Sequence, residues 1–272
     1  MARRPRIERA LKYFVVLVVL VVLGHGLLQG DRALLRLFSG LSSAILVGMV
    51  ATLISAKAAQ YSLDSTFGRT LWLVTQVVAY WLFGQLGALI YEYILASQPP
   101  RPGFIDAAQL AFYAVVLYAI VFFFRAARAK FTRYQLAEAA LPALALLLAS
   151  AALVIAPAYG RLGAPGPAEW FDMMHPVLTS LLLFVTVLLV LLFKRETVAA
   201  GARLMLSGFA VYALGGLLLS YEKLNAAYYA GGFSTALILL GFSMVGLGAG
   251  LIEKDAHELY RVLTGFFFLR EE

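Results

Sequence analysis

Several polar side chains lie at or near the ends of long apolar segments, where they could bind a small molecule or an ion. A Tyr-Glu pair occurs twice, and acidic, amide and imidazole groups open later segments. The residues that we expect to line an outward-facing ligand pocket are Tyr91, Glu92, Asp106, Gln109, His175, Tyr221 and Glu222. Polar groups within apolar segments are costly in lipid and therefore suggest function. The alternative is a belt at the membrane–water interface, where such side chains are partly hydrated.

Two histidines, His25 and His175, are the candidates for ligands of haem or a metal ion. A histidine pair with no third ligand type nearby is a weak signal, so we expect no haem, no metal site and no other cofactor. The chain has no cysteine, which excludes thiolate ligands and cysteine nucleophiles; this composition also fits a thermophilic source. No HExxH, serine-elbow or P-loop motif is present, so we expect a protein that is not an enzyme.

Eight apolar segments of about 20 residues must position these side chains. The segments cover residues 13–29, 33–55, 70–96, 104–124, 136–158, 174–193, 203–221 and 231–252. Each can cross a bilayer as a helix, which satisfies its own backbone hydrogen bonds. With 62% hydrophobic residues and a mean hydropathy of +0.85, the chain is expected to be an all-α, polytopic membrane protein of eight transmembrane helices. The loop before the sixth segment is expected to end in Glu169–Asp172.

The basic residues determine the expected orientation. If the N-terminus is cytoplasmic, most of the 22 Lys and Arg residues fall on the cytoplasmic side, and the exceptions are Arg32, Arg36, Arg101, Arg161 and Lys223. This bias follows the positive-inside rule and predicts a multi-pass protein of the cell membrane with both termini in the cytoplasm. Lipid headgroups therefore account for the net charge of +7, and we expect no binding of nucleic acid.

The third and seventh segments are similar to each other. Each begins with glycine and arginine and ends in a Tyr-Glu pair. Segments in corresponding positions predict two parallel four-helix halves. The expected units are a basic cytoplasmic arm, the first half, the second half and an amphipathic cytoplasmic tail, at residues 1–12, 13–128, 129–252 and 253–272.

Small residues in the last segment predict close helix packing. Gly246 and Gly250 form a GxxxG pattern, with Gly241 and Gly248 nearby.

Three stretches carry a resemblance to a known family: Gly68–Leu73, Tyr91–Leu95 and Gln98–Asp106. They resemble the membrane sensor regions that precede some archaeal and bacterial histidine kinases and diguanylate cyclases, and a weaker copy follows at 201–222. The likeness covers about residues 60–252 and implies signal input rather than catalysis.

The matching positions within this resemblance are Tyr91, Glu92, Pro100 and Asp106. The chain departs from the pattern at Gly103 and Phe104, where Pro-Ser is usual. No kinase or cyclase sequence follows the last segment, so the resemblance implies output through a cytoplasmic or membrane partner in trans.

The expected function is that of a non-catalytic membrane protein, sensor-like or partner-docking, whose pocket responds to a small ligand; the bilayer is its environment and an oligomer is left open. One alternative is a transporter or channel for a small molecule or ion, which also uses repeats. The crowding of polar residues at segment ends argues against it, as do Pro142 and Pro176, which we place near helix starts. The other alternative is an accessory subunit of a larger membrane complex, for example a respiratory one.

Overall fold

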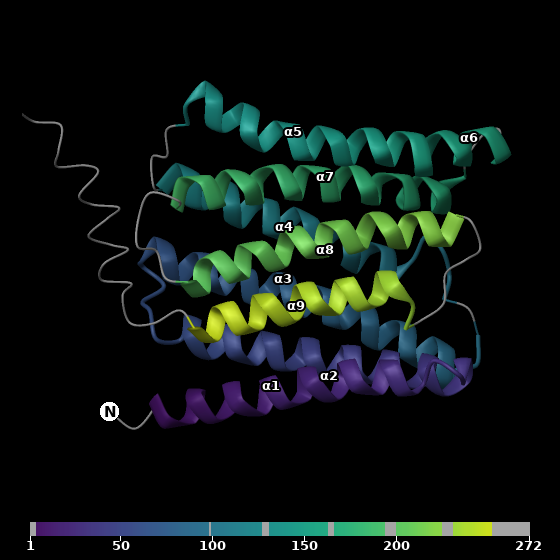
Figure 1. The fold of residues 1–272 in the computed structure, drawn as a ribbon, viewed down its shortest axis with the longest axis horizontal. Coiled ribbons are helices and arrows are strands. Elements are labelled where there is room, and N and C mark those ends of the chain that lie inside the picture. Colours follow the sequence, from purple (N-terminus) through teal and green to yellow (C-terminus); the bar gives the residue numbers. More distant parts are fainter. Residues whose placement is uncertain are drawn as a thin grey trace, which may run out of the picture.

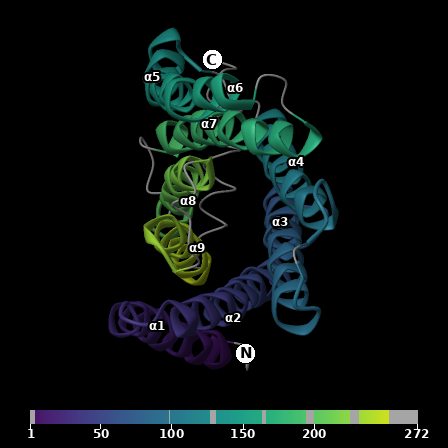
Figure 2. The same ribbon diagram turned by 90° about the vertical axis from the view of Figure 1, so that its right-hand side faces the viewer.

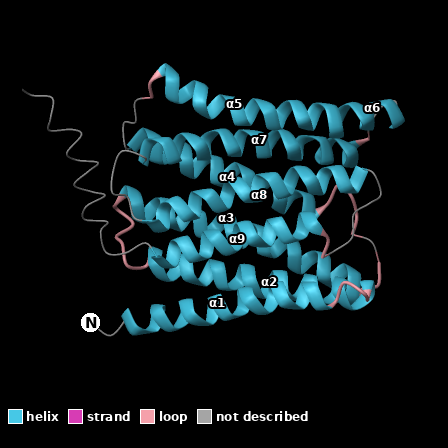
Figure 3. Ribbon diagram, viewed as in Figure 1, coloured by secondary structure: helices cyan, strands magenta, loops and turns pink. Residues whose placement is uncertain are grey.

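The computed structural model describes residues 4–97, 99–126, 131–162, 166–193, 200–224 and 231–251. Throughout these ranges the regular structure is helical, and none of the described residues forms a strand (Figure 3). The predicted all-α fold is confirmed. Helices are expected here because the long apolar segments can satisfy their backbone groups internally within lipid.

The helices follow the apolar segments closely. Their bounds are α1 Arg4–Leu27, α2 Arg32–Ala58, α3 Thr66–Leu89, α4 Phe104–Ala126, α5 Arg133–Ser150, α6 Ala156–Leu162, α7 Pro167–Phe193, α8 Ala200–Leu224 and α9 Phe233–Leu251. Two π-helical turns, η1 Ile90–Ile94 and η2 Ala151–Ile155, continue α3 and α5.

Seven of the described helices are long and apolar enough to cross a membrane: α2, α3 with η1, α4, α5 with η2, α7, α8 and α9. The chain is therefore a multi-pass membrane protein. The apolar stretch of α1, Lys12–Leu27, is shorter than the others.

Polar side chains immediately before three of the helices determine where they begin. Asp31 accepts hydrogen bonds from the N–H groups of Ala33 and Leu34 at the start of α2. Ser65 accepts from Gly68 in the same way before α3. Thr132 and Gln135 form a reciprocal capping box at α5. Each cap satisfies backbone donors that the first helical turn leaves free.

Helix α7 begins earlier than the sequence predicts. It starts at Pro167, where proline is well tolerated because the first helical N–H groups have no partner within the helix. Asp172, expected in a loop, is therefore helical. Pro176 of α7 and Pro142 of α5, which the sequence analysis places near helix starts, both lie in the interior of their helices, so that expectation is wrong. Proline has no N–H to donate, so the carbonyl of Asp172 lacks its usual helical hydrogen bond.

Six of the helices close into a ring. Viewed along the helices, α2, α3, α4, α7, α8 and α9 follow one another, and each contacts the next (Figure 2). Helix α1 packs outside the ring against α2 and α9, and α5 packs outside it against α7 (Figures 1 and 2).

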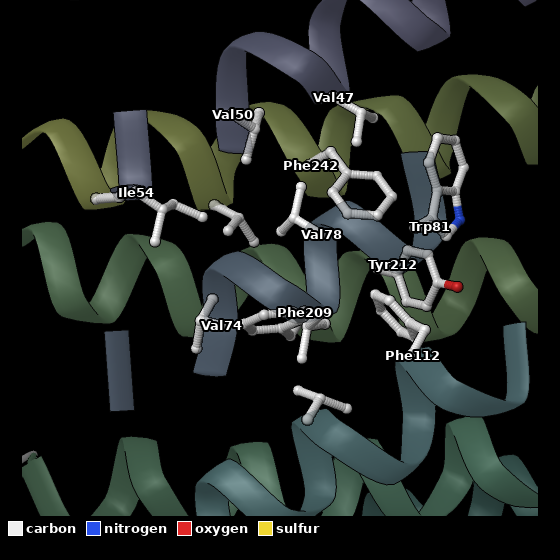
Figure 4. Packing of buried hydrophobic residues seen from close by; sticks show 14 of the residues in the cluster. Val47, Val50, Ile54, Val74, Val78, Trp81, Phe112, Phe209, Tyr212 and Phe242 are labelled. Atoms are coloured by element: carbon white, nitrogen blue, oxygen red, sulfur yellow. The ribbon is translucent and has the colours of Figure 1, made fainter. Parts of the chain in front are cut away.

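Large apolar side chains fill the inside of this ring. Trp81, Phe112, Tyr212 and Phe242 come from four different helices and contact one another (Figure 4). The ring centroids of Trp81 and Phe242 are 4.6 Å apart, and those of Phe112 and Tyr212 are 4.9 Å apart. Aromatic pairs at these separations attract each other in addition to excluding solvent. Valine, leucine and isoleucine continue the core along the helices.

Glycines allow α8 and α9 to approach most closely. A Cβ atom placed on Gly208 would lie 2.6 Å from the carbonyl oxygen of Gly241, and one on Gly241 would lie 2.8 Å from that of Gly208. Gly248, seven residues after Gly241, faces the backbone of Met205 in the same manner. Gly246 instead faces α1 and α2. The close contact with α8 therefore uses Gly241 and Gly248, which lie two helical turns apart.

We expect Gly241→Ala to destabilise the protein by about 1 to 3 kcal/mol, because the added methyl group meets backbone atoms that cannot move unless α8 and α9 separate. The midpoint of thermal unfolding in detergent would measure this. The matched control is Gly26→Ala, since nothing lies within 4 Å of a Cβ atom at Gly26. Equal effects of the two substitutions would contradict the proposed close packing.

Candidate functional site

A polar cavity lies between α4, α7 and α8. The end of α6 and the beginning of α7 lie at this end of the bundle (Figure 1). The volume of the cavity is about 20 Å³, enough for one water molecule. We call it the Asp106 site. The side chains that line it are Asp106, Gln109, Leu110, Tyr113, Phe171, Asp172, His175, Leu178, Leu219, Ser220 and Lys223.

Asp106 is the buried carboxylate of this site. It is the third residue of α4, and its Oδ2 accepts a hydrogen bond of 3.0 Å from the N–H of Gly103, which caps the helix. Its Oδ1 accepts from Nη2 and Nε of Arg101, at 2.8 and 3.3 Å. Only 6% of the Asp106 side chain is exposed, so its charge depends on these donors.

Arg101 joins α4 to α7. Its Nη1 and Nη2 donate hydrogen bonds of 3.0 Å to the two carboxylate oxygens of Asp172, so the contact is bidentate. Such pairs are among the stronger polar contacts in proteins because charge and geometry match together. Hydrogen bonds from Arg101 to Asp172 raise the pKa of its guanidinium above the usual value, and those to Asp106 add to the rise, although partial burial opposes both.

His175 lies deeper than the two carboxylates. Its Nε2 is 3.0 Å from the hydroxyl of Tyr113, and the two rings meet edge to face. Gly216 provides the space for this ring: a Cβ atom there would lie 3.2 Å from Cε1 of His175 and 2.9 Å from Cγ2 of Thr179. Helix α8 can therefore lie close to α7 at the level of the imidazole.

A chain of contacting aromatic rings leads from His175 into the core. The ring centroid of Tyr113 is 6.4 Å from that of Tyr212, which lies 5.3 Å from that of Phe242, and the rings of Phe242 and Trp81 are 4.6 Å apart. The four aromatic side chains are buried, and that of His175 is half-buried. The chain connects the charged site at the end of the bundle to the aromatic cluster at its centre.

Three of the seven predicted pocket residues line this cavity: Asp106, Gln109 and His175. The other four lie elsewhere. Glu92, in η1 beside Tyr91, forms an ion pair with Arg36 of α2. Glu222 accepts a hydrogen bond of 2.5 Å from the hydroxyl of Ser234 on α9, and the adjacent Tyr221 is 39% exposed. The two Tyr-Glu pairs therefore contact different neighbours.

Sequence reasoning missed several members of the site, although the helical spacing carried a signal for them. Tyr113 follows Gln109 by four residues and Asp106 by seven, so all three share one face of α4. Asp172 precedes His175 by three residues on α7 in the same way. Arg101, however, precedes α4, and no helical periodicity predicts its contact with α7.

The two histidines do not form a common site. His25 lies on α1, where its Nδ1 is 2.8 Å from the carbonyl oxygen of Val21 and its ring packs edge to face against Phe38. His175 lies at the cavity on α7. Among the described residues, no three side chains of the metal-binding types lie close enough to hold an ion.

The Asp106 site presents hydrogen-bond donors and acceptors to a small space. Two carboxylates, an amide, hydroxyl groups, an imidazole and the amine of Lys223 line the cavity, and they come from α4, α7 and α8. Aromatic and aliphatic side chains form the remaining walls, as is common in ligand sites that combine apolar walls with a few polar groups.

We expect Asp106→Asn to destabilise the protein by about 3 kcal/mol, because it removes the buried partner of Arg101. Asp172→Asn should cost about 1 kcal/mol or less, since 24% of that side chain is exposed to solvent. Thermal unfolding in lipid nanodiscs would measure both.

The control for these substitutions is Asp31→Asn, because asparagine caps helices as well as aspartate does. If Asp106→Asn behaved like this control, the ion pairs with Arg101 would not stabilise the fold.

Comparison with family models, with curated proteins and with solved structures finds no match for this chain.

Proposed function

We propose that this membrane protein is a non-catalytic sensor that binds a small polar ligand at the Asp106 site and transmits its occupancy to the packing of the helices. The observation that carries the proposal is the chain of contacts from the hydrogen-bonded pair His175 and Tyr113 through the rings of Tyr212 and Phe242 to Trp81. It gives the charged site a physical connection to the core. A change at the cavity therefore has a route to the centre of the bundle.

The place of the site supports sensing over transport. Asp106 is the third residue of α4, Asp172 is the sixth of α7, and Lys223 is next to last in α8, so all three lie at helix ends. Transporters place their substrate sites near the middle of the membrane. Beyond Trp81, the described core inside the ring is filled mostly by apolar side chains such as Val74, Val78 and Phe209.

We also propose that α1 is an eighth span and that the chain consists of two parallel four-helix halves. Within the first half α1, α2, α3 and α4 pack in sequence, as do α5, α7, α8 and α9 in the second. The halves meet where α2 contacts α9 and where α4 contacts α7. A two-fold axis along the bundle that exchanges the halves would exchange these two contacts, and it would place α1 and α5 in corresponding positions outside the ring.

In this arrangement the Asp106 site lies at one of the two joints between the halves. Arg101 and Asp106 belong to the first half, whereas Asp172 and His175 belong to the second. A ligand that changes these contacts shifts the balance between two arrangements of α4 against α7. Pro176 lies within this part of α7, where the missing helical hydrogen bond makes bending easier.

Transport remains the second candidate, and two observations favour it. The repeat-like packing is common among transporters, and Pro176 interrupts the hydrogen bonds of a spanning helix beside the site. Movement of solute across proteoliposomes separates transport from sensing.

The proposed topology predicts that Ser97→Cys reacts with a membrane-impermeant thiol reagent on intact cells, whereas Gln60→Cys reacts only after permeabilisation. Both side chains are exposed and lie in connections at opposite ends of α3. The absence of native cysteines leaves each variant with a single reactive group. The reverse labelling pattern would overturn cytoplasmic termini.

The proposed coupling predicts that Asp172→Asn alters the fluorescence of Trp81, because the change at the cavity is passed through Tyr113. The measurement uses protein in nanodiscs whose other two tryptophans are replaced by Trp72→Phe and Trp170→Phe. Adding Tyr113→Phe should weaken the effect, since it removes the hydroxyl that is hydrogen-bonded to His175. If the fluorescence emission of Trp81 is the same with and without Asp172→Asn, the sensor mechanism is contradicted.

A further inference from the structure

Arg101 bridges the two carboxylates of the Asp106 site as an internal cation. Its guanidinium lies between two carboxylates on different helices and donates hydrogen bonds to both, at distances of 2.8 to 3.3 Å. It comes from the connection before α4 rather than from a spanning helix, and 35% of its side chain is exposed. The site is thus already shaped to hold a planar, positively charged group supplied from outside the ring.

The carboxylates are the fixed members of this arrangement. Asp106 is buried and also caps α4 through the N–H of Gly103, so it cannot turn away without uncapping the helix. Asp172 is carried by α7. Arg101 has a long, flexible side chain with a route to solvent. Of these three charged residues, Arg101 can therefore be displaced by a ligand at the lowest cost in free energy.

Charge balance limits what can replace it. Arg101 and Lys223 offset the two aspartates that line the same cavity. When the guanidinium leaves, a ligand with one positive charge restores the balance. A second positive charge on the ligand would be repelled by Lys223. An anion would instead have to displace carboxylates that the helices hold in place.

We propose that the Asp106 site binds a small organic monocation with a guanidine or amine head group, which takes the place of Arg101 between Asp106 and Asp172. The proposal rests on the sensor function and names the class of its ligand. The walls contributed by Tyr113 and Phe171 suit such a cation, because aromatic faces attract positive charge. The space between the two carboxylates, which both line the cavity of about 20 Å³, limits the ligand to a small head group.

Displacement of Arg101 has a structural consequence. The bidentate contact with Asp172 joins the connection before α4 to α7. A bound cation satisfies both carboxylates but, unlike Arg101, it is not part of the chain and does not tie α7 to the connection before α4. The joint between α4 and α7 is then free to move, which is the change that a sensor has to produce.

The test uses the full chain in lipid nanodiscs with methylguanidine as the probe. N-Methylurea is the matched neutral probe, because it has nearly the same shape without the charge, and acetate is the anionic probe. In Arg101→Ala the space between the carboxylates is vacant. We expect methylguanidine to raise the thermal unfolding midpoint of Arg101→Ala, and to bind it about tenfold more tightly than the unsubstituted protein, in which Arg101 competes.

Two further variants keep the test decisive. Asp172→Asn in the Arg101→Ala background should abolish the stabilisation, because one carboxylate of the site is gone. If Arg101→Ala does not fold, Arg101→Gln removes the charge while it keeps an amide donor. Stabilisation by N-methylurea equal to that by methylguanidine, or stabilisation by acetate that Arg101→Ala abolishes, would overturn the proposal.

This outcome can be separated from that of the sensor proposal. The fluorescence of Trp81 after Asp172→Asn tests coupling without any ligand. If methylguanidine selectively stabilises Arg101→Ala but the fluorescence of Trp81 does not respond to Asp172→Asn, the ligand class is supported and the sensor proposal is overturned. Uptake of labelled methylguanidine into proteoliposomes would also support the ligand class, and would assign it to transport.

Discussion

Helices in a bilayer are not driven together by the hydrophobic effect, because the surrounding lipid chains are as apolar as leucine. They associate through close packing and through polar contacts between helices. The ring of α2, α3, α4, α7, α8 and α9 depends on both. Glycines bring the backbones of α8 and α9 into contact, and aromatic side chains from four helices fill the space inside. The positions of all other groups, including the charged ones, follow from this packing.

Polar contacts complete the ring at one end. Where α4 meets α7, Arg101 connects two carboxylates that belong to different helices. Close to the ends of the helices water is available, so a charged residue costs less there than in the middle of the membrane. The same position makes the contact accessible to solutes. A joint that both holds the bundle together and is open to solvent is a reasonable place for a ligand to act.

The connection from this joint to the core distinguishes the site from an ordinary interfacial belt. Interfacial tyrosines usually direct their hydroxyls to water. Tyr113 instead directs its hydroxyl to the imidazole of His175, and its ring contacts that of Tyr212. Tyr212 in turn belongs to the aromatic cluster with Phe242 and Trp81. In the proposed sensor, this series of contacts couples the site to the packing.

Local sequence was sufficient for the helices and for part of the site. Apolar runs of the length of a bilayer can only be helical in lipid, and for that reason most helix ends were predicted to within about four residues. The starts of α1 and α7 were misplaced because polar and charged residues, Glu169 and Asp172 among them, lie within the first turns of these helices. Asp106 and Gln109 were predicted together because both are polar residues at the beginning of the same apolar segment.

Tertiary structure decided which neighbour each face meets. Glu222 and Lys223 are adjacent in sequence, but successive residues of a helix point about 100° apart. Lys223 therefore lines the cavity, whereas Glu222 contacts Ser234 on α9. Likewise, the contact of Arg101 with Asp172 joins residues 71 positions apart, and it exists only because α4 and α7 lie side by side in the ring. The sequence by itself determined that the chain folds as apolar helices and which side chains share a face, since both depend on local geometry; the rotation and order of the helices depend on packing between distant segments, and only the assembled ring decided them.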